Sequence, residues 1–121
     1  MSIDNLFLQL KDIQFQADKI LKSKDLEFEV VEKFAAYSKD LKISLIGIEV
    51  NEDLSIHLND IEIIDTNYDP KPSIVIALIG ALSFGIASKK YRKKKREAYF
   101  RKTVKNTKDQ FAHIDFLLKE I

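Results

Sequence analysis

The sequence predicts an α+β fold: two N-terminal helices and a short antiparallel β-hairpin, followed by a long helical C-terminal half. Three observations lead to this prediction. Apolar residues recur every three or four positions near the N-terminus, alternate with polar residues in the middle of the chain, and return to the three-and-four spacing near the C-terminus. The first and last patterns are typical of amphipathic helices, and the alternating pattern is typical of half-buried strands.

Charge divides the chain into two parts. Its 121 residues, 45% of them hydrophobic, suffice for one small core. Residues 1–72 carry 8 basic and 15 acidic side chains, whereas residues 73–121 carry 12 basic and 4 acidic ones. We therefore predict an acidic α+β domain at residues 1–69, followed at residues 70–121 by an apolar segment and a basic, amphipathic helix. This asymmetry indicates either attraction between the two parts or two different partners.

The two N-terminal helices are predicted at residues 3–21 and 26–39. The first has an apolar stripe with spacings of three and four, formed by Ile3, Leu6, Leu10, Ile13, Ala17 and Ile20. Residues 22–25 interrupt this pattern. The apolar residues of the second helix are expected to face the core. They are Leu26, Val30, Val31, Phe34 and Tyr37.

The predicted β-hairpin pairs residues 41–50 with residues 54–63. Apolar and polar residues alternate in both segments, and the Asn-Glu-Asp sequence at 51–53 has the composition of a turn. The alternating apolar residues are Leu41, Ile43 and Leu45 in the first strand and Leu54, Ile56 and Leu58 in the second.

An uncharged run, Ser73–Ser88, follows the two prolines of the chain. Small residues recur in it every four positions, at Ser73, Ala77, Ala81 and Gly85. On a helix this stripe allows two backbones to approach closely, as in associating membrane helices. Sixteen helical residues span roughly 24 Å, less than the ~30 Å hydrocarbon core of a bilayer. The run is interpreted either as a membrane segment or as a buried core element.

Nine positively charged residues lie between Lys89 and Lys102, opposed only by Glu97. They are Lys89, Lys90, Arg92, Lys93, Lys94, Lys95, Arg96, Arg101 and Lys102. Beside an apolar run, such a cluster is suited to anionic lipid headgroups. With Tyr91, Tyr99 and Phe100 interleaved, it also suits the phosphates and bases of a nucleic acid.

The C-terminal helix is predicted from an apolar seam and from the absence of glycine and proline after Ser88. The seam consists of Phe100, Val104, Phe111, Ile114, Leu118 and Ile121, with Thr107 as its polar member. We expect it to pair with another helix, and the N-terminal helix has the matching spacing. If those two helices pair, Ser73–Ser88 does not cross a bilayer once between them.

No constellation of residues indicates catalysis, a metal or a cofactor. The chain has no cysteine, and its histidines, His57 and His113, have no fixed spacing to carboxylates. The D-x-N-x-D sequence at residues 65–69 lacks the glycine and the glutamate that complete a calcium loop. We predict that the protein is not an enzyme.

Three functions remain as hypotheses. The first is a non-catalytic, membrane-associated interaction protein with Ser73–Ser88 inserted as a transmembrane helix, residues 89–102 on anionic lipid, and the basic half on the cytoplasmic side. It would self-associate or bind a protein partner through the stripe and the seam. The second is a soluble, cytoplasmic α+β binding module of the inhibitor or immunity type, whose acidic half engages a basic partner. The third is nucleic-acid binding through residues 89–102.

Overall fold

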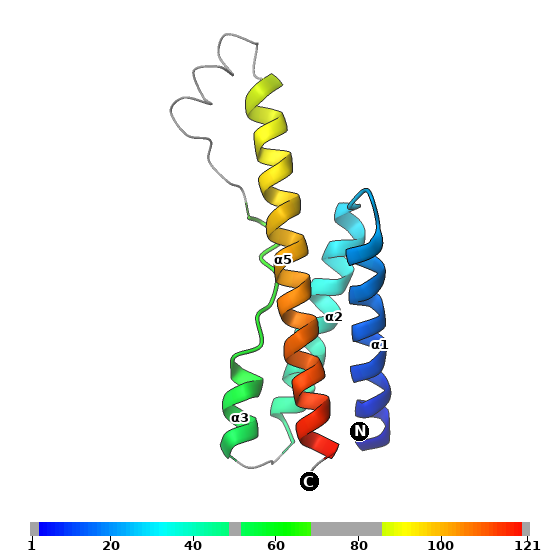
Figure 1. The fold of residues 1–121 in the computed structure, drawn as a ribbon. Coiled ribbons are helices and arrows are strands. Elements are labelled where there is room, and N and C mark those ends of the chain that lie inside the picture. The colour runs from blue at the N-terminus through cyan, green and yellow to red at the C-terminus, as the bar shows by residue number, and fades with distance from the viewer. Residues whose placement is uncertain (1–2, 49–51, 69–85, 120–121) are drawn as a thin grey trace.

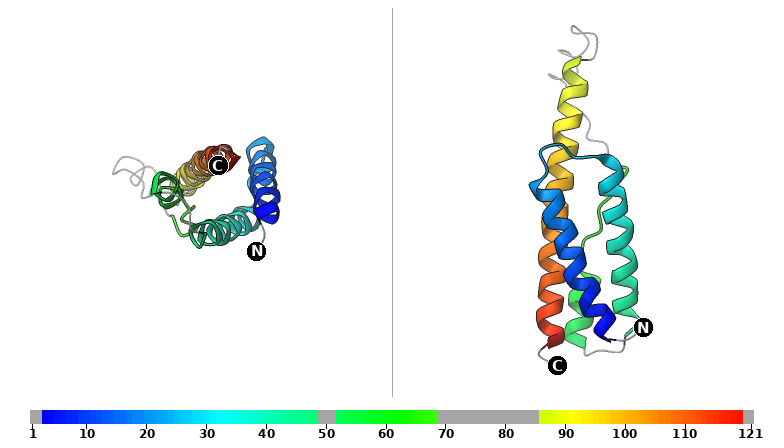
Figure 2. Two further views of the ribbon diagram at one scale, coloured as in Figure 1. Left: turned by 90° about the horizontal axis from the view of Figure 1, so that it is seen from below. Right: turned by 90° about the vertical axis from the view of Figure 1, so that its right-hand side faces the viewer.

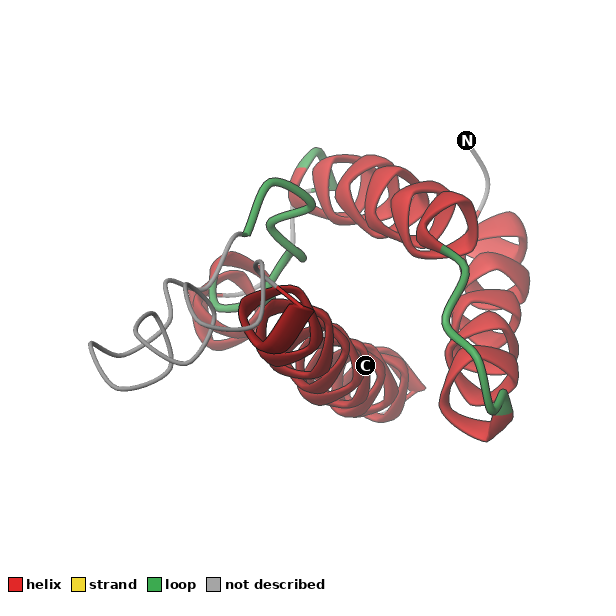
Figure 3. Cartoon of the chain, turned by 90° about the horizontal axis from the view of Figure 1, so that it is seen from above, coloured by secondary structure: helices red, strands yellow, loops and turns green. Residues whose placement is uncertain are grey.

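The computed structural model describes residues 3–48, 52–68 and 86–119. Within these ranges the chain forms four helices: α1 (Ile3–Lys22), α2 (Phe28–Ile46), α3 (Glu52–Asn59) and α5 (Ile86–Lys119). α1 packs antiparallel to both α2 and α5, and α3 bridges α2 and α5 at the end of the bundle where α1 begins and α5 ends (Figure 1). Views along the bundle show the helices arranged around a common centre (Figures 2 and 3).

Side chains from every helix fill this centre. α1 buries Leu6, Leu10, Ile13, Ala17 and Ile20, which are five of the six positions that the sequence pattern predicted to face inward. The side chain of the sixth, Ile3, lies outside the described part. The five buried side chains meet Val31, Phe34, Leu41 and Leu45 of α2, Leu54 and Leu58 of α3, and Phe100, Val104, Phe111 and Ile114 of α5. The core thus joins residues from both predicted parts of the chain, and the boundary predicted between those parts falls in the range 69–85, outside the described residues.

The α+β prediction is wrong, because the described residues contain no β-strand. Residues 41–46 of the first predicted strand form the end of α2, which continues to Ile46, and the last two residues of that predicted strand lie outside the described ranges. Leu41 and Leu45 are buried one helical turn apart, whereas Ile43 between them is 58% exposed. Three apolar residues at alternate positions fit a helix as well as a strand when the middle one faces solvent.

The second predicted strand is divided between α3 and an extended segment, residues 60–68. Leu54 and Leu58 are buried on one face of α3, and Ile56 is 60% exposed. Beyond α3 the chain runs back along α5 and buries Ile61 and Ile64 (Figure 1).

Side chains of α5 take the place that a neighbouring strand would have beside the extended segment. Gln110 accepts a hydrogen bond from the Glu62 N–H at 2.7 Å and donates one to the Asp60 carbonyl at 2.7 Å. Tyr99 Oη accepts one from the Asp65 N–H at 3.0 Å. Because backbone polar groups are almost always paired, these contacts allow the segment to pack on the bundle without a sheet.

Two polar interactions join α1 to α5. Lys108 donates to the carboxylate of Asp18, and this hydrogen bond lowers the pKa of Asp18 below its ordinary value. Arg101 donates to four backbone carbonyls at the C-terminus of α1 and in the loop after it: Ile20, Leu21, Ser23 and Lys24, at 2.7–3.4 Å. The carbonyls that end a helix have no partner inside it, so this guanidinium caps α1.

The described part of the chain does not support the prediction of a transmembrane helix, because none of the described helices combines the length and the apolar character that crossing a bilayer requires. The predicted segment, Ser73–Ser88, lies outside the described residues except for its last three residues, which begin α5. The small-residue stripe Ser73, Ala77, Ala81 and Gly85 lies outside the described residues.

Candidate functional site

The N-terminal part of α5 projects beyond the rest of the bundle. At about 1.5 Å per residue, the 34 residues of α5 reach about 51 Å, whereas the 20 residues of α1 reach about 30 Å. The excess lies past the loop that joins α1 to α2 (Figures 1 and 2). We call residues 90–95 of this projection the arm.

The arm carries five of the nine predicted basic residues in exposed positions. They are Lys90, Arg92, Lys93, Lys94 and Lys95. Among the described residues none of them forms an ion pair, and the Lys95 ammonium lies 5.8 Å from the centre of the Tyr91 ring. Lys102 is exposed further along α5, and the side chain of Lys89 lies outside the described part. The arm is therefore a concentrated positive surface that no carboxylate of the described residues pairs with.

Arg96 and Arg101, which the sequence groups with the others, instead contact the bundle. Arg101 caps α1. The Arg96 guanidinium packs on two aromatic rings, 4.8 Å from the centre of Phe28 and 5.5 Å from the centre of Phe100. It also donates to the Thr66 carbonyl at 3.2 Å. These contacts fix the base of the arm on α2 and on the extended segment.

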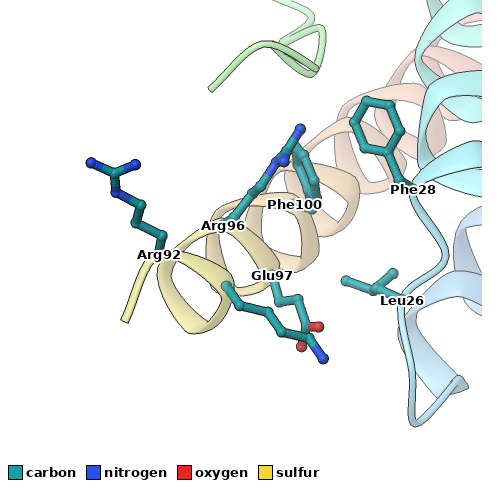
Figure 4. A pocket seen from close by; sticks show the side chains of 7 residues that line it. Leu26, Phe28, Arg92, Arg96, Glu97 and Phe100 are labelled. Carbon is teal, nitrogen blue, oxygen red and sulfur yellow. The ribbon is translucent and has the colours of Figure 1, made fainter. Parts of the chain in front are cut away.

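A cleft of about 370 Å³ opens between the arm and the start of α2 (Figure 4). Its charged residues all come from α5, whereas two of its three apolar residues come from the start of α2 and the loop before it. The lining residues are Leu26 and Phe28 from the start of α2 and the loop before it, and Arg92, Lys93, Arg96, Glu97 and Phe100 from α5. In Figure 4, Arg92 extends outward at one end of the cleft, while Arg96 lies against Phe100 with Phe28 facing it.

Three members of this cleft, Leu26, Phe28 and Glu97, were not predicted as functional. Leu26 was assigned to the interior of the second helix, and Phe28 was given no role. Phe28 is 44% exposed in spite of its size. The signal in the sequence is that Phe28 lies beside the inward stripe of that helix rather than in it, but only the structure shows that it faces Arg96.

The predicted seam lies in the interior and is not an open surface. Phe100, Val104, Phe111 and Ile114 are buried, with Thr107 among them, and Leu118 is half-buried. Ile121 lies outside the described residues. The seam packs against α1 and its neighbours, so within the described chain it serves the bundle itself.

The structure brings together His57 of α3 and His113 of α5, which the sequence left unconnected. Their rings meet edge to face with centres 4.8 Å apart. With Asp60, Asp109 and Gln110 they line a second cavity of about 320 Å³. No group of three or more metal-binding side chains is present among the described residues, so this pair is not assigned to a metal.

The chemistry of the arm and the cleft is that of a binding surface. It offers several cations, one carboxylate and an apolar wall, and we find in it no arrangement of a nucleophile with a base. Comparisons with protein-family models, with curated proteins and with solved structures gave no match to this chain.

Proposed function

We propose that this protein is a non-catalytic binding module that engages an acidic protein partner through the arm. The observation that carries the proposal is the projection of five exposed cations beyond the bundle, without an ion pair among the described residues. Charge of one sign on a protruding element speeds the encounter with a partner of opposite charge and limits the choice of partner.

Acidic groups around the arm favour a protein over a nucleic acid. Glu97 lines the cleft beside Lys93, and Asp25 and Glu27 line the adjoining surface on the other side of Leu26. The evenly spaced phosphates of a nucleic acid would meet these carboxylates. On a protein surface, carboxylates are separated by neutral and basic side chains. Such a surface can place neutral or basic groups against Glu97, Asp25 and Glu27.

The distribution of cations around the helix argues against a flat anionic surface such as a lipid headgroup layer. Arg92, Lys93, Lys94 and Lys95 are consecutive, and at 3.6 residues per turn they point to all sides of α5. A helix that lies on a membrane has one apolar face and one basic face. A partner that encloses the arm, or contacts it from several sides, makes use of all four side chains.

The proposal is tested by measuring the binding of the whole chain to poly-glutamate at several salt concentrations. A double charge reversal in the arm, Lys90→Glu with Lys94→Glu, is compared with the same charge change elsewhere, Lys11→Glu with Lys39→Glu. All four lysines are exposed. We expect the arm variant to bind about tenfold more weakly, which corresponds to about 1.4 kcal/mol, and the control to bind within about twofold of the unchanged protein.

Parallel measurements use a single-stranded oligonucleotide and vesicles that contain phosphatidylserine. Tighter binding of poly-glutamate than of either probe, with affinity that falls as salt rises, supports the proposal. An equal loss of affinity for poly-glutamate in the two double variants would overturn the proposal. Tighter binding of the oligonucleotide or of the vesicles would also overturn it.

A further inference from the structure

We infer that the cleft beside the arm selects acidic segments that carry one large apolar side chain, which packs against Leu26 and the exposed part of the Phe28 ring. This inference rests on the proposed function and specifies the partner. The arm alone offers charge, which attracts any acidic chain. The cleft adds an apolar wall that distinguishes one acidic chain from another.

The apolar wall has the exposure and shape for such an anchor. Phe28 is 44% exposed, although its ring lies 6.3 Å from that of the buried Phe100 in a tilted arrangement. Leu26, half-buried, lines the same cleft from the loop between α1 and α2. The volume of about 370 Å³ is at the low end of the range for ligand pockets, about 300–1,000 Å³, and has room for one large side chain.

The charged side of the cleft determines which residues of the bound segment can lie next to its apolar side chain. Arg92 and Lys93 are exposed at the cleft and are available to carboxylates next to the anchor residue. Arg96 packs on the rings of Phe28 and Phe100 and adds a further positive charge to the cleft. Its Nε atom is buried and has no hydrogen-bond partner among the described residues. Positive charge thus surrounds an apolar recess, and the complementary ligand is an apolar side chain among acidic ones.

The test compares two synthetic peptides of equal length and equal negative charge, one with a central phenylalanine and one with serine in its place. Both are titrated against the whole protein in the same buffer. We expect the phenylalanine peptide to bind about tenfold more tightly.

Two surface phenylalanines provide a matched pair of variants. Phe28→Ala removes a wall of the cleft, whereas Phe116→Ala truncates a side chain that is 60% exposed near the other end of α5. We expect Phe28→Ala to bind both peptides equally and Phe116→Ala to keep the preference. Leu26→Ser is a second cleft variant, outside the helices, for use if Phe28→Ala lowers the helix content measured by circular dichroism.

The outcomes separate this inference from the function on which it rests. A preference for phenylalanine that is lost in the cleft variants and kept in Phe116→Ala supports it. Equal, salt-dependent binding of both peptides by the unchanged protein would overturn the inference and leave the proposed function standing. Failure of both peptides to bind would overturn both.

Discussion

Arg101 shows how the role of a residue depends on the helix next to it. In the sequence it is one of nine clustered cations, and nothing local separates it from Lys102. In the fold its guanidinium reaches the end of α1 and donates to four carbonyls, while Lys102 stays exposed. The fork of donors on arginine suits several acceptors at once, which a lysine ammonium matches less well.

Truncation of Arg101 is expected to destabilise the protein. Arg101→Ala removes the guanidinium donor from the Leu21 carbonyl at the end of α1 and from the Ser23 and Lys24 carbonyls of the loop. We expect the free energy of unfolding to fall by about 1.5–3 kcal/mol, the usual worth of hydrogen bonds to a charged group. Arg101→Lys should recover only part of this loss. Lys102→Ala, as the control, should stay within about 0.5 kcal/mol of the unchanged protein. Urea unfolding measures all three; an equal effect of the alanine variants would contradict the capping role.

Tyr37 provides a second prediction for a single residue. Burial, together with the hydrogen bond that its hydroxyl donates to Asp12 at 2.9 Å, raises its pKa to about 12. Since the fold favours the neutral hydroxyl, the stability it contributes is fully present below pH 10.0, the ordinary pKa, and is lost as the pH rises toward about 12.

Ultraviolet absorbance of tyrosinate measures this ionisation directly. Tyr37→Phe should remove the component that titrates near pH 12. Asp12→Asn should lower the pKa of Tyr37 but keep it above 10.0, because burial is the larger cause. Titration of Tyr37 at 10.0 in the unchanged protein would show that the hydroxyl does not pack between α1 and α2 as described.

At the scale of elements, the helices with long apolar stripes could be predicted and the middle of the chain could not. The stripe of α1 repeats over 20 residues, and the seam of α5 is similarly sustained. Around Ile43 and Ile56 only three apolar residues alternate at a time, and in both cases the middle one faces solvent. Alternation over so few residues does not separate a strand from one face of a short helix.

The extended segment could not be predicted because its hydrogen-bond partners are distant in sequence. Gln110 and Tyr99 bind backbone groups of Asp60, Glu62 and Asp65 from 34 to 50 positions away. A segment whose backbone bonds to distant side chains has the same local composition as a strand whose backbone bonds to another strand. The sequence around it therefore does not distinguish the two.

Amide hydrogen exchange tests whether these two side chains hold the segment. Gln110→Ala should speed exchange of the Glu62 amide and leave that of Asp65 protected. Tyr99→Phe should speed exchange of the Asp65 amide and leave that of Glu62 protected, because the Tyr99 hydroxyl accepts from the Asp65 N–H and not from the Glu62 N–H. Alternating protection along residues 54–63 that neither variant changes would instead indicate strand pairing.

At the scale of the whole molecule, the pairing of α1 with α5 is the contact on which the other features depend. It sets the register in which Arg101 reaches the end of α1, and it leaves the arm projecting past the loop that joins α1 to α2. The sequence indicated this pairing through matching apolar spacing. It could not indicate the cleft, because Leu26 and Phe28 meet Arg96 and Phe100 only after the helices pack.

Zero-length crosslinking with a carbodiimide tests this pairing most directly, because it joins only carboxylates and amines that touch. We predict an amide bond between Asp18 and Lys108 in the monomeric fraction, identified by mass spectrometry and absent in Asp18→Asn. The pair Glu29–Lys33, 3.5 Å apart within α2, controls for reactivity. A bond at the control pair without one between Asp18 and Lys108 would contradict the fold and remove the basis for the arm and the cleft.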